Sequence, residues 1–208
     1  MILKICGLSD PENIREVSSL HPDMMGFIFY APSPRNACAL LHREVRNLPE
    51  DIDRVGVFVD APVSHVLHLA EKYALTTIQL HGHESPAMCD EIRSNGYRVM
   101  KALGINRDTD WEEYRCYEGH TDLFILDTLT AMHGGSGRKF NWSLLQDYPL
   151  QSPFLLSGGI GPDDARAAME AEASMTLMTG IDINSRFETS PGHKNITLLK
   201  QFINELKR

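Results

Sequence analysis

The chain lacks the features that mark several large classes of protein. It carries a net charge of −8 over 208 residues and contains no run of Lys and Arg, which argues against a general nucleic-acid surface. The longest apolar stretch, residues 24–31, is too short to cross a bilayer. The N-terminus shows no signal-peptide pattern. We therefore expect no nucleic-acid partner and no membrane partner.

Cysteine is sparse as well. The four cysteines, Cys6, Cys38, Cys89 and Cys116, are scattered and form no C-x-x-C pair. That usage fits a reduced compartment better than a disulfide framework, so we expect a cytoplasmic protein. For the oligomeric state we expect a monomer or a weak homodimer.

Motifs for cofactors and for a serine nucleophile are missing. The segment Gly135-Ser136-Gly137 is followed by Phe140 where a dinucleotide fingerprint would need glycine, and no serine lies in a G-x-S-x-G pattern. The pair His65 and His68 has no apparent third metal ligand, and residues 81–83 lack a cluster of cysteines or carboxylates. We expect no cofactor and no metal.

What the chain does contain is a series of short apolar runs with helical segments between them. The runs are continuous rather than alternating, as in strands that are covered on both faces. We expect strands at 3–6, 25–29, 54–59, 77–80, 98–102, 123–126, 154–157 and 176–179, with helices at 62–73, 85–94, 162–170 and 195–207 and another opened by Asp10 and Pro11.

Eight strands that alternate with helices fit either a closed barrel or an open doubly wound sheet. The strand starts are evenly spaced, and 208 residues over eight units is 26 residues a unit, which is sufficient for a barrel. The open sheet would be favoured by a dinucleotide fingerprint, and none is present. We therefore predict an α/β fold, a single (β/α)8 TIM barrel over residues 1–208, with no second domain.

In such a barrel the functional groups lie at the carboxyl ends of the strands. Cys6 ends the first strand, and Lys4 points to the same side two residues earlier, where its charge can lower the thiol pKa. Taken alone, Cys6 is more often a small buried hydrophobe. Asp127 ends the sixth strand; taken alone, it is as readily a helix cap or the partner of a lysine. Arg35 follows the second strand and could bind a carboxylate; taken alone, it is as readily a solvated loop arginine.

Two loops indicate a phosphate site. Gly158 and Gly159 lie between the seventh strand and a helix, where bare backbone amides favour an anion. We predict that the loop after the eighth strand adds donors from Asp182, Asn184 and Ser185, because these barrels often hold a phosphate there.

A third loop, after the sixth strand, has the length of a lid. It spans residues 128–140, before a helix that we expect at Trp142, and its core contains Gly134, Gly135 and Gly137. We expect this segment to be a functional loop.

Short segments along nearly the whole chain match one family in order. They are KICG at 4–7, GFIFY at 26–30 with SPR at 33–35, VGVF at 55–58, IQLHG at 78–82, LD at 126–127 with GGSG at 134–137, FNW at 140–142, SGGI at 157–160 and GID at 180–182. With these segments the chain resembles the phosphoribosylanthranilate isomerases of tryptophan biosynthesis.

The resemblance implies an Amadori rearrangement of a small phosphorylated substrate. N-(5-phosphoribosyl)anthranilate, an aldose amine, would be converted to the ketose 1-(2-carboxyphenylamino)-1-deoxyribulose 5-phosphate. By position, Asp127 matches the general acid that opens the ribose ring, and Cys6 matches the general base that removes the C2′ proton. Arg35 matches the residue that binds the anthranilate carboxylate, and the two loops named above match the phosphate site.

One departure from the family concerns the loop after the eighth strand. Arg186 stands where the family commonly has glycine; arginine does not freely adopt a positive φ, although its guanidinium could itself contact phosphate. Two alternatives stay open. One is the related isomerase of histidine biosynthesis, which Cys6 and a single glycine pair disfavour. The other is a catalytically silent barrel that acts as a binding module, which the presence of both Cys6 and Asp127 disfavours.

Overall fold

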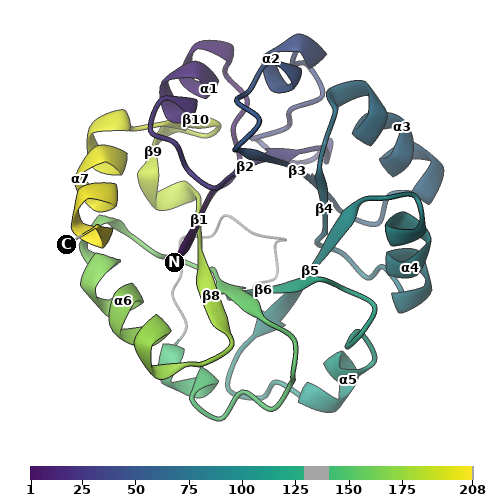
Figure 1. The fold of residues 1–208 in the computed structure, drawn as a ribbon, viewed down its shortest axis with the longest axis vertical. Coiled ribbons are helices and arrows are strands. Elements are labelled where there is room, and N and C mark those ends of the chain that lie inside the picture. Colours follow the sequence, from purple (N-terminus) through teal and green to yellow (C-terminus); the bar gives the residue numbers. More distant parts are fainter. Residues whose placement is uncertain (129–140, 208) are drawn as a thin grey trace.

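Eight parallel strands follow one another in chain order around a closed barrel, and β8 pairs back to β1 (Figure 1). The structure is a computed structural model that describes residues 1–128 and 141–207. The strands are β1 Ile2–Ile5, β2 Met24–Ile28, β3 Asp53–Phe58, β4 Thr77–Leu80, β5 Arg98–Ile105, β6 Leu123–Thr128, β7 Phe154–Leu156 and β8 Met178–Ile183. The predicted eightfold barrel is confirmed.

Helices cover the outside of the ring of strands (Figure 1). They are α1 Pro11–Ser18, α2 His42–Arg46, α3 Val63–Tyr73, α4 Pro86–Ser94, α5 Trp111–Arg115, α6 Ala165–Ser174 and α7 Ile196–Leu206. Short 3-10 turns are η1 Trp142–Leu145, η2 Pro162–Asp164 and η3 Ser185–Phe187, and a small antiparallel pair, β9 Glu188–Ser190 and β10 His193–Lys194, follows β8. The Asp10 side chain caps α1 by accepting from the backbone N–H of Asn13 at 2.8 Å, as expected from the sequence.

Two of the differences from the predicted elements are informative. The eighth strand was expected at 176–179 but spans Met178–Ile183, because its pairing with β1 runs from Gly180 to Ile183. The segment at Trp142, expected to begin a helix, forms only the turn η1. For the eighth strand, local composition favours residues 176–179, and pairing with the distant strand β1 decides the outcome.

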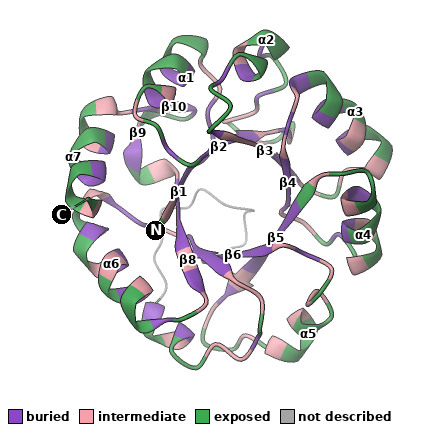
Figure 2. Cartoon of the chain, in the orientation of Figure 1, coloured by how far each residue is buried: buried purple, intermediate pink, exposed green. Residues whose placement is uncertain are grey.

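The apolar core has two parts. The larger part packs between the outer faces of the strands and the helices, and the strands are buried while the outer helix faces are exposed (Figure 2). The smaller part fills the barrel interior with Met24, Val55, Met100, Ala102, Leu123, Ile125 and Leu155. Because side chains alternate along each strand, Lys4, Gln79 and Asp182 share that interior and are also buried. These three polar side chains point into the barrel interior from strands whose carboxyl ends form the site described below.

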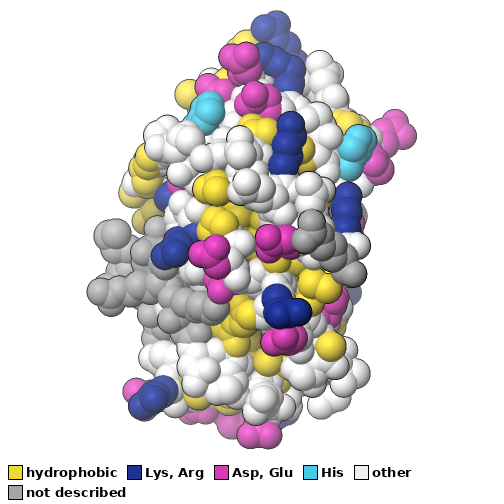
Figure 3. Space-filling view, turned by 90° about the vertical axis from the view of Figure 1, so that its left-hand side faces the viewer, with side chains coloured by type: hydrophobic (Ala, Val, Ile, Leu, Met, Phe, Trp, Pro, Cys, Tyr) yellow, Lys and Arg dark blue, Asp and Glu magenta, His cyan; other side chains and the backbone are white. Residues whose placement is uncertain are grey.

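Charges are interspersed on the side of the molecule that Figure 3 shows. Acidic and basic side chains lie next to one another there, and neither sign gathers into one patch. Among the described residues, no helix combines the length and the apolar composition needed to cross a membrane.

Candidate active site

A buried ion pair and a thiol form the centre of the site. Cys6 directly follows β1, and its backbone N–H donates to the carbonyl of Ile183 at 2.9 Å, which continues the ladder with β8. Lys4 lies opposite Asp182 in that ladder, and Lys4 Nζ donates to Asp182 Oδ1 at 2.9 Å. Gly26 on β2 leaves room for the sulfur, because a Cβ at that position would lie 2.7 Å from Cys6 Sγ. The strand order thus places a cation beside the thiol.

Burial and the neighbouring charges shift the pKa values at this centre in opposite directions. Burial raises the pKa of the Cys6 thiol, while the positive charges of Lys4 and Lys194 act to lower it. Burial acts against a charged Lys4, but the negative charges of Asp182 and Cys6 outweigh it and raise the Lys4 pKa. Lys4 is therefore protonated, and its positive charge favours the thiolate form of Cys6 beside it.

Asp127 lies near the end of β6, and its side chain is 16% exposed. Burial raises the pKa of Asp127 to about 6, and the Thr128 N–H, which donates to Asp127 Oδ1 at 2.7 Å, opposes that shift. Asp182 raises the Asp127 pKa further and Lys4 lowers it. The charges of Lys4 and Asp182 therefore act on both the carboxyl of Asp127 and the thiol of Cys6.

His81 directly follows β4 and is a neighbour of Asp127 that carried no predicted catalytic role. Its Nε2 lies 3.7 Å from Asp127 Oδ2, and Gln79 Nε2 lies 3.2 Å from His81 Nδ1. An amide nitrogen only donates, so Gln79 favours the histidine tautomer that carries its proton on Nε2, facing Asp127. The sequence-based predictions considered residues 81–83 only as metal ligands.

The glycine turn after β7 lies next to Asp127. Gly158 and Gly159 have φ of 84° and 70°, so both adopt the left-handed region that favours glycine. A Cβ on Gly158 would clash with Thr128 and lie 2.9 Å from Asp127 Oδ1. Arg186 also lies at this turn, because its Nε is 3.4 Å from where a Cβ of Gly161 would be. Ser185 begins η3 beside Arg186.

Two predicted phosphate residues have different surroundings from those expected. Asp182 lies within β8 and not in the loop after it, and its buried carboxylate pairs with Lys4, so the loop placement was wrong. A carboxylate inside a buried strand resembles a loop residue in sequence unless its distant counter-ion is known. Asn184 Oδ1 accepts from Lys194 Nζ at 2.7 Å and lies beside Gly7, so that side chain already has a partner.

Arg35 lies at the mouth of the barrel and already has a carboxylate partner. Its Nε donates to Glu188 Oε1 at 2.9 Å and its Nη2 donates to Glu188 Oε2 at 2.7 Å. The side chains of Arg35 and Glu188 are 11% and 5% exposed. Glu188 and Lys194 lie on β9 and β10, elements that carried no signal in the sequence.

The predicted lid residues Gly134, Gly135 and Gly137 lie outside the described residues. Within residues 1–128 and 141–207, no group of three or more His, Cys, Asp and Glu side chains is arranged to hold a metal ion.

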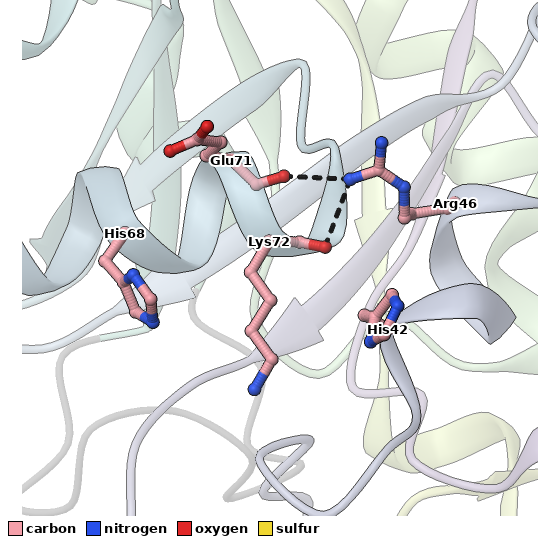
Figure 4. Close-up of a pocket in the computed structure, with 5 residues that line it drawn as sticks. All are labelled: His42, Arg46, His68, Glu71 and Lys72. Atoms are coloured by element: carbon pink, nitrogen blue, oxygen red, sulfur yellow. Dashed lines mark hydrogen bonds between the residues drawn. The ribbon is translucent and has the colours of Figure 1, made fainter.

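A separate cavity of about 380 Å³ lies in the helical layer (Figure 4). His42 and Arg46 line it from α2, and His68, Glu71 and Lys72 line it from α3. Arg46 Nη1 donates to the carbonyl oxygens of Glu71 at 3.0 Å and Lys72 at 3.3 Å, which ties the two helices together. All of its lining residues belong to these helices, and none comes from a strand end.

A family model and curated relatives match almost the whole chain. The model described as N-(5'-phosphoribosyl)anthranilate isomerase matches residues 3–205. A protein of that name from Phocaeicola vulgatus is 41% identical over 208 residues, which cover 100% of this chain and 98% of the relative.

Solved structures match over the same length. The phosphoribosyl anthranilate isomerase of Thermotoga maritima is 32% identical, with a TM-score of 0.82 and coverage of 100% of this chain and 99% of the other. A further phosphoribosyl anthranilate isomerase structure, in complex with reduced 1-(o-carboxyphenylamino)-1-deoxyribulose 5-phosphate, is 30% identical, with a TM-score of 0.80 and the same coverage.

Proposed function

The chain belongs to the N-(5'-phosphoribosyl)anthranilate isomerase family, and from that membership we propose a role for each residue at the strand ends. The enzyme is an isomerase of tryptophan biosynthesis that converts an aldose amine to a ketose by an Amadori rearrangement. The reaction needs one proton donor for ring opening and one base for the carbon-bound proton. The related isomerase of histidine biosynthesis is set aside, because the family model and the relatives carry the anthranilate name.

Asp127 acts as the general acid. It protonates the ribose ring oxygen, the C1′–O bond breaks, and the anthranilate nitrogen supplies the electron pair that forms a Schiff base. A carboxyl with a pKa of about 6 keeps a proton near neutral pH far more often than an ordinary aspartate. At pH 7 about a tenth of the enzyme would carry that proton.

Cys6 acts as the general base. Its thiolate removes the C2′ proton, and the electron pair moves into the C1′–C2′ bond to give an enolamine, which then ketonises. Lys4 supports the thiolate and Asp182 holds Lys4 in place, since all three side chains lie in one buried contact. This contact, whose charges also act on Asp127, is the observation that carries the proposal.

Arg35 binds the anthranilate carboxylate, and the turn at Gly158 and Gly159 binds the phosphate together with Ser185 and Arg186. Positive φ values at both glycines and the guanidinium beside the turn support the phosphate site. Asn184 remains a candidate phosphate ligand through its backbone N–H. We leave Asp182 out, because a carboxylate repels phosphate and this one pairs with Lys4.

We further propose that the 208 residues act as one barrel domain in the cytoplasm, as a monomer or a weak homodimer. All four cysteines are free thiols, which supports a reduced compartment. Sedimentation at micromolar concentration tests the oligomeric state.

The roles of Cys6 and Asp127 are tested by turnover, followed as loss of anthranilate fluorescence without added metal or nucleotide. Cys6→Ser and Asp127→Asn should each lower kcat by about 10² or more, because each removes a proton-transfer group. Arg35→Ala should mainly raise KM. Near-normal kcat in the first two variants would refute the acid–base assignment, and an inactive wild type would favour a binding module.

A further inference from the structure

The guanidinium of Arg35 is held by Glu188 along one edge only. Glu188 accepts from Nε and from one N–H of Nη2, at 2.9 Å and 2.7 Å. A guanidinium has five N–H donors, so the edge formed by Nη1 and the second N–H of Nη2 remains for another acceptor. That edge has the spacing of a carboxylate. Glu188 therefore occupies the side of the fork and leaves its end available.

Glu188 is itself fixed by a small hairpin. Glu188 on β9 lies opposite Lys194 on β10, and Lys194 Nζ donates to Glu188 Oε1 at 2.7 Å. The hairpin is fastened to α1, because Asn13 Oδ1 accepts from the Lys194 N–H at 2.7 Å and Asn13 Nδ2 donates to the Lys194 carbonyl at 2.9 Å. A carboxylate on such a support can hold a guanidinium in one plane.

The same cluster lies beside the thiol. A Cβ on Gly7, the residue after Cys6, would lie 2.8 Å from Arg35 Cδ and 2.6 Å from Asn184 Oδ1. The arginine stem thus packs over the backbone next to Cys6. The charge of Lys194 also reaches this thiol and acts to lower its pKa, which burial raises. With Glu188 ionised and Lys194 protonated, the cluster of Arg35, Glu188 and Lys194 carries one net positive charge near the reacting centre. Burial lowers the Lys194 pKa, and the charge of Glu188 opposes that shift.

We propose that Glu188 is a positioning residue that sets carboxylate specificity by aiming the free end of the Arg35 guanidinium at the substrate carboxylate. Lys194 is the counter-ion that keeps the cluster cationic while Glu188 is ionised. Hydrogen bonds from Arg35 and the charge of Lys194 hold the Glu188 pKa below its usual value, although burial acts to raise it. The proposal rests on the carboxylate role of Arg35 given above.

The test compares two ligands in one calorimetric titration series. One is reduced 1-(2-carboxyphenylamino)-1-deoxyribulose 5-phosphate, and the other is the same compound without the carboxyl group. The measured quantity is the Kd of the ligand without the carboxyl group divided by the Kd of the carboxylated ligand, which gives the preference for the carboxylate. Glu188→Gln should reduce the wild-type preference for the carboxylated ligand by about tenfold. Without Glu188 the Arg35 guanidinium is no longer aligned, and its charged contact with the ligand carboxylate is lost. Binding of the ligand without the carboxyl group should change less than about twofold.

Contrary results of two kinds would overturn the proposal. An equal loss of affinity for both ligands would leave the ratio unchanged and would mean that Glu188 only supports the fold. Unchanged Kd values for both ligands, or an increased ratio, would mean that net charge and not orientation governs carboxylate binding. A wild type with no preference for the carboxylated ligand would refute the Arg35 role and this proposal together. A wild-type preference that Glu188→Gln leaves intact would refute this proposal alone.

Two further variants keep the test interpretable if the single change unfolds the hairpin. Glu188→Gln combined with Lys194→Met removes the unpaired buried ammonium, and the ratio should remain low in this double variant. Glu44→Gln removes the partner of Arg15 at 3.1 Å in an ion pair on the helical layer, and it should leave the ratio unchanged. Thermal unfolding of each variant confirms that folded protein is compared.

Discussion

Lys4 and Lys101 are both buried lysines that pair with a carboxylate and whose charge acts on a cysteine, and only the cysteine beside Lys4 lies at the carboxyl end of a barrel strand. Lys4 Nζ lies 2.9 Å from Asp182 and beside Cys6, whereas Lys101 Nζ lies 3.2 Å from Glu84, with its charge acting on Cys89. Burial raises the pKa of Cys6, and it raises the pKa of Cys89 to about 11. The two groups have the same composition.

Their positions in the barrel differ. The Lys4 group faces the barrel interior at the carboxyl end of β1, next to the space that Gly26 leaves around the sulfur. The Lys101 group lies outside the strands, where Lys101 Nζ donates to the Gly82 carbonyl at 2.7 Å and Glu84 accepts from the Gly82 N–H at 2.9 Å. The outer group fastens the loop after β4, and Cys89 packs in the core. Location, and not composition, separates the proposed base Cys6 from the packing residue Cys89.

The largest expected effect comes from Lys4→Met. Loss of the cation should raise the Cys6 pKa further and slow alkylation of Cys6 at pH 8 about 10- to 100-fold, with a matching fall in kcat. Unpaired Asp182 should also lower the free energy of unfolding by about 3–5 kcal/mol. Alkylation by iodoacetamide is followed by mass spectrometry in a Cys38→Ser/Cys116→Ser background, since both of those thiols are exposed.

Lys101→Met is the matched control for that variant. It should lower the free energy of unfolding by about 3–5 kcal/mol as well, because Glu84 is left buried without its cation. Alkylation of Cys6 should keep its wild-type rate. Equal slowing of Cys6 alkylation in both variants would erase the distinction between the interior and outer groups.

The next effect concerns Asp127, a second interior carboxyl that has no counterpart in the outer group. Its pKa of about 6 in the folded protein exceeds the ordinary value of 3.8, so its contribution to stability is present below pH 4 and is lost as the pH rises through 6. Asp127→Asn does not titrate. At pH 8 this variant should be more stable than the wild type by up to about 3 kcal/mol, and the gain should vanish below pH 4.

Urea unfolding at several pH values measures that difference. The ¹³Cγ resonance of Asp127 in the free enzyme, assigned by comparison with Asp127→Asn, gives the pKa directly and without the titrating phosphate of a substrate. A titration near 3.8, or equal stabilities at all pH values, would contradict the burial effect.

The smallest expected effect is that of Cys89→Ala. Removing one buried sulfur atom should lower the free energy of unfolding by about 1 kcal/mol, as small core truncations do. Turnover should be unchanged, in contrast to Cys6→Ser. The denaturation midpoint and the fluorescence assay measure the two quantities, and a large fall in kcat would give the outer group a role in catalysis.

Much of the fold was predictable because it depends on local pattern. Continuous apolar runs predicted the strands, and Asp10 with Pro11 predicted the start of α1. The eighth strand was placed too early because residues 176–179 have strand-like composition, while the register with β1 selects 178–183. The hairpin of β9 and β10 is too short and too polar to produce a signal.

The sequence by itself determined the succession of strands and helices and the common face of Lys4 and Cys6, because both follow from the periodicity of neighbouring residues. Tertiary structure alone decided which carboxylate Lys4 meets and which residue holds Arg35. Asp182 and Lys4 are 178 residues apart and meet only when β8 closes the barrel against β1. Such contacts depend on register between distant strands, which local propensity does not encode.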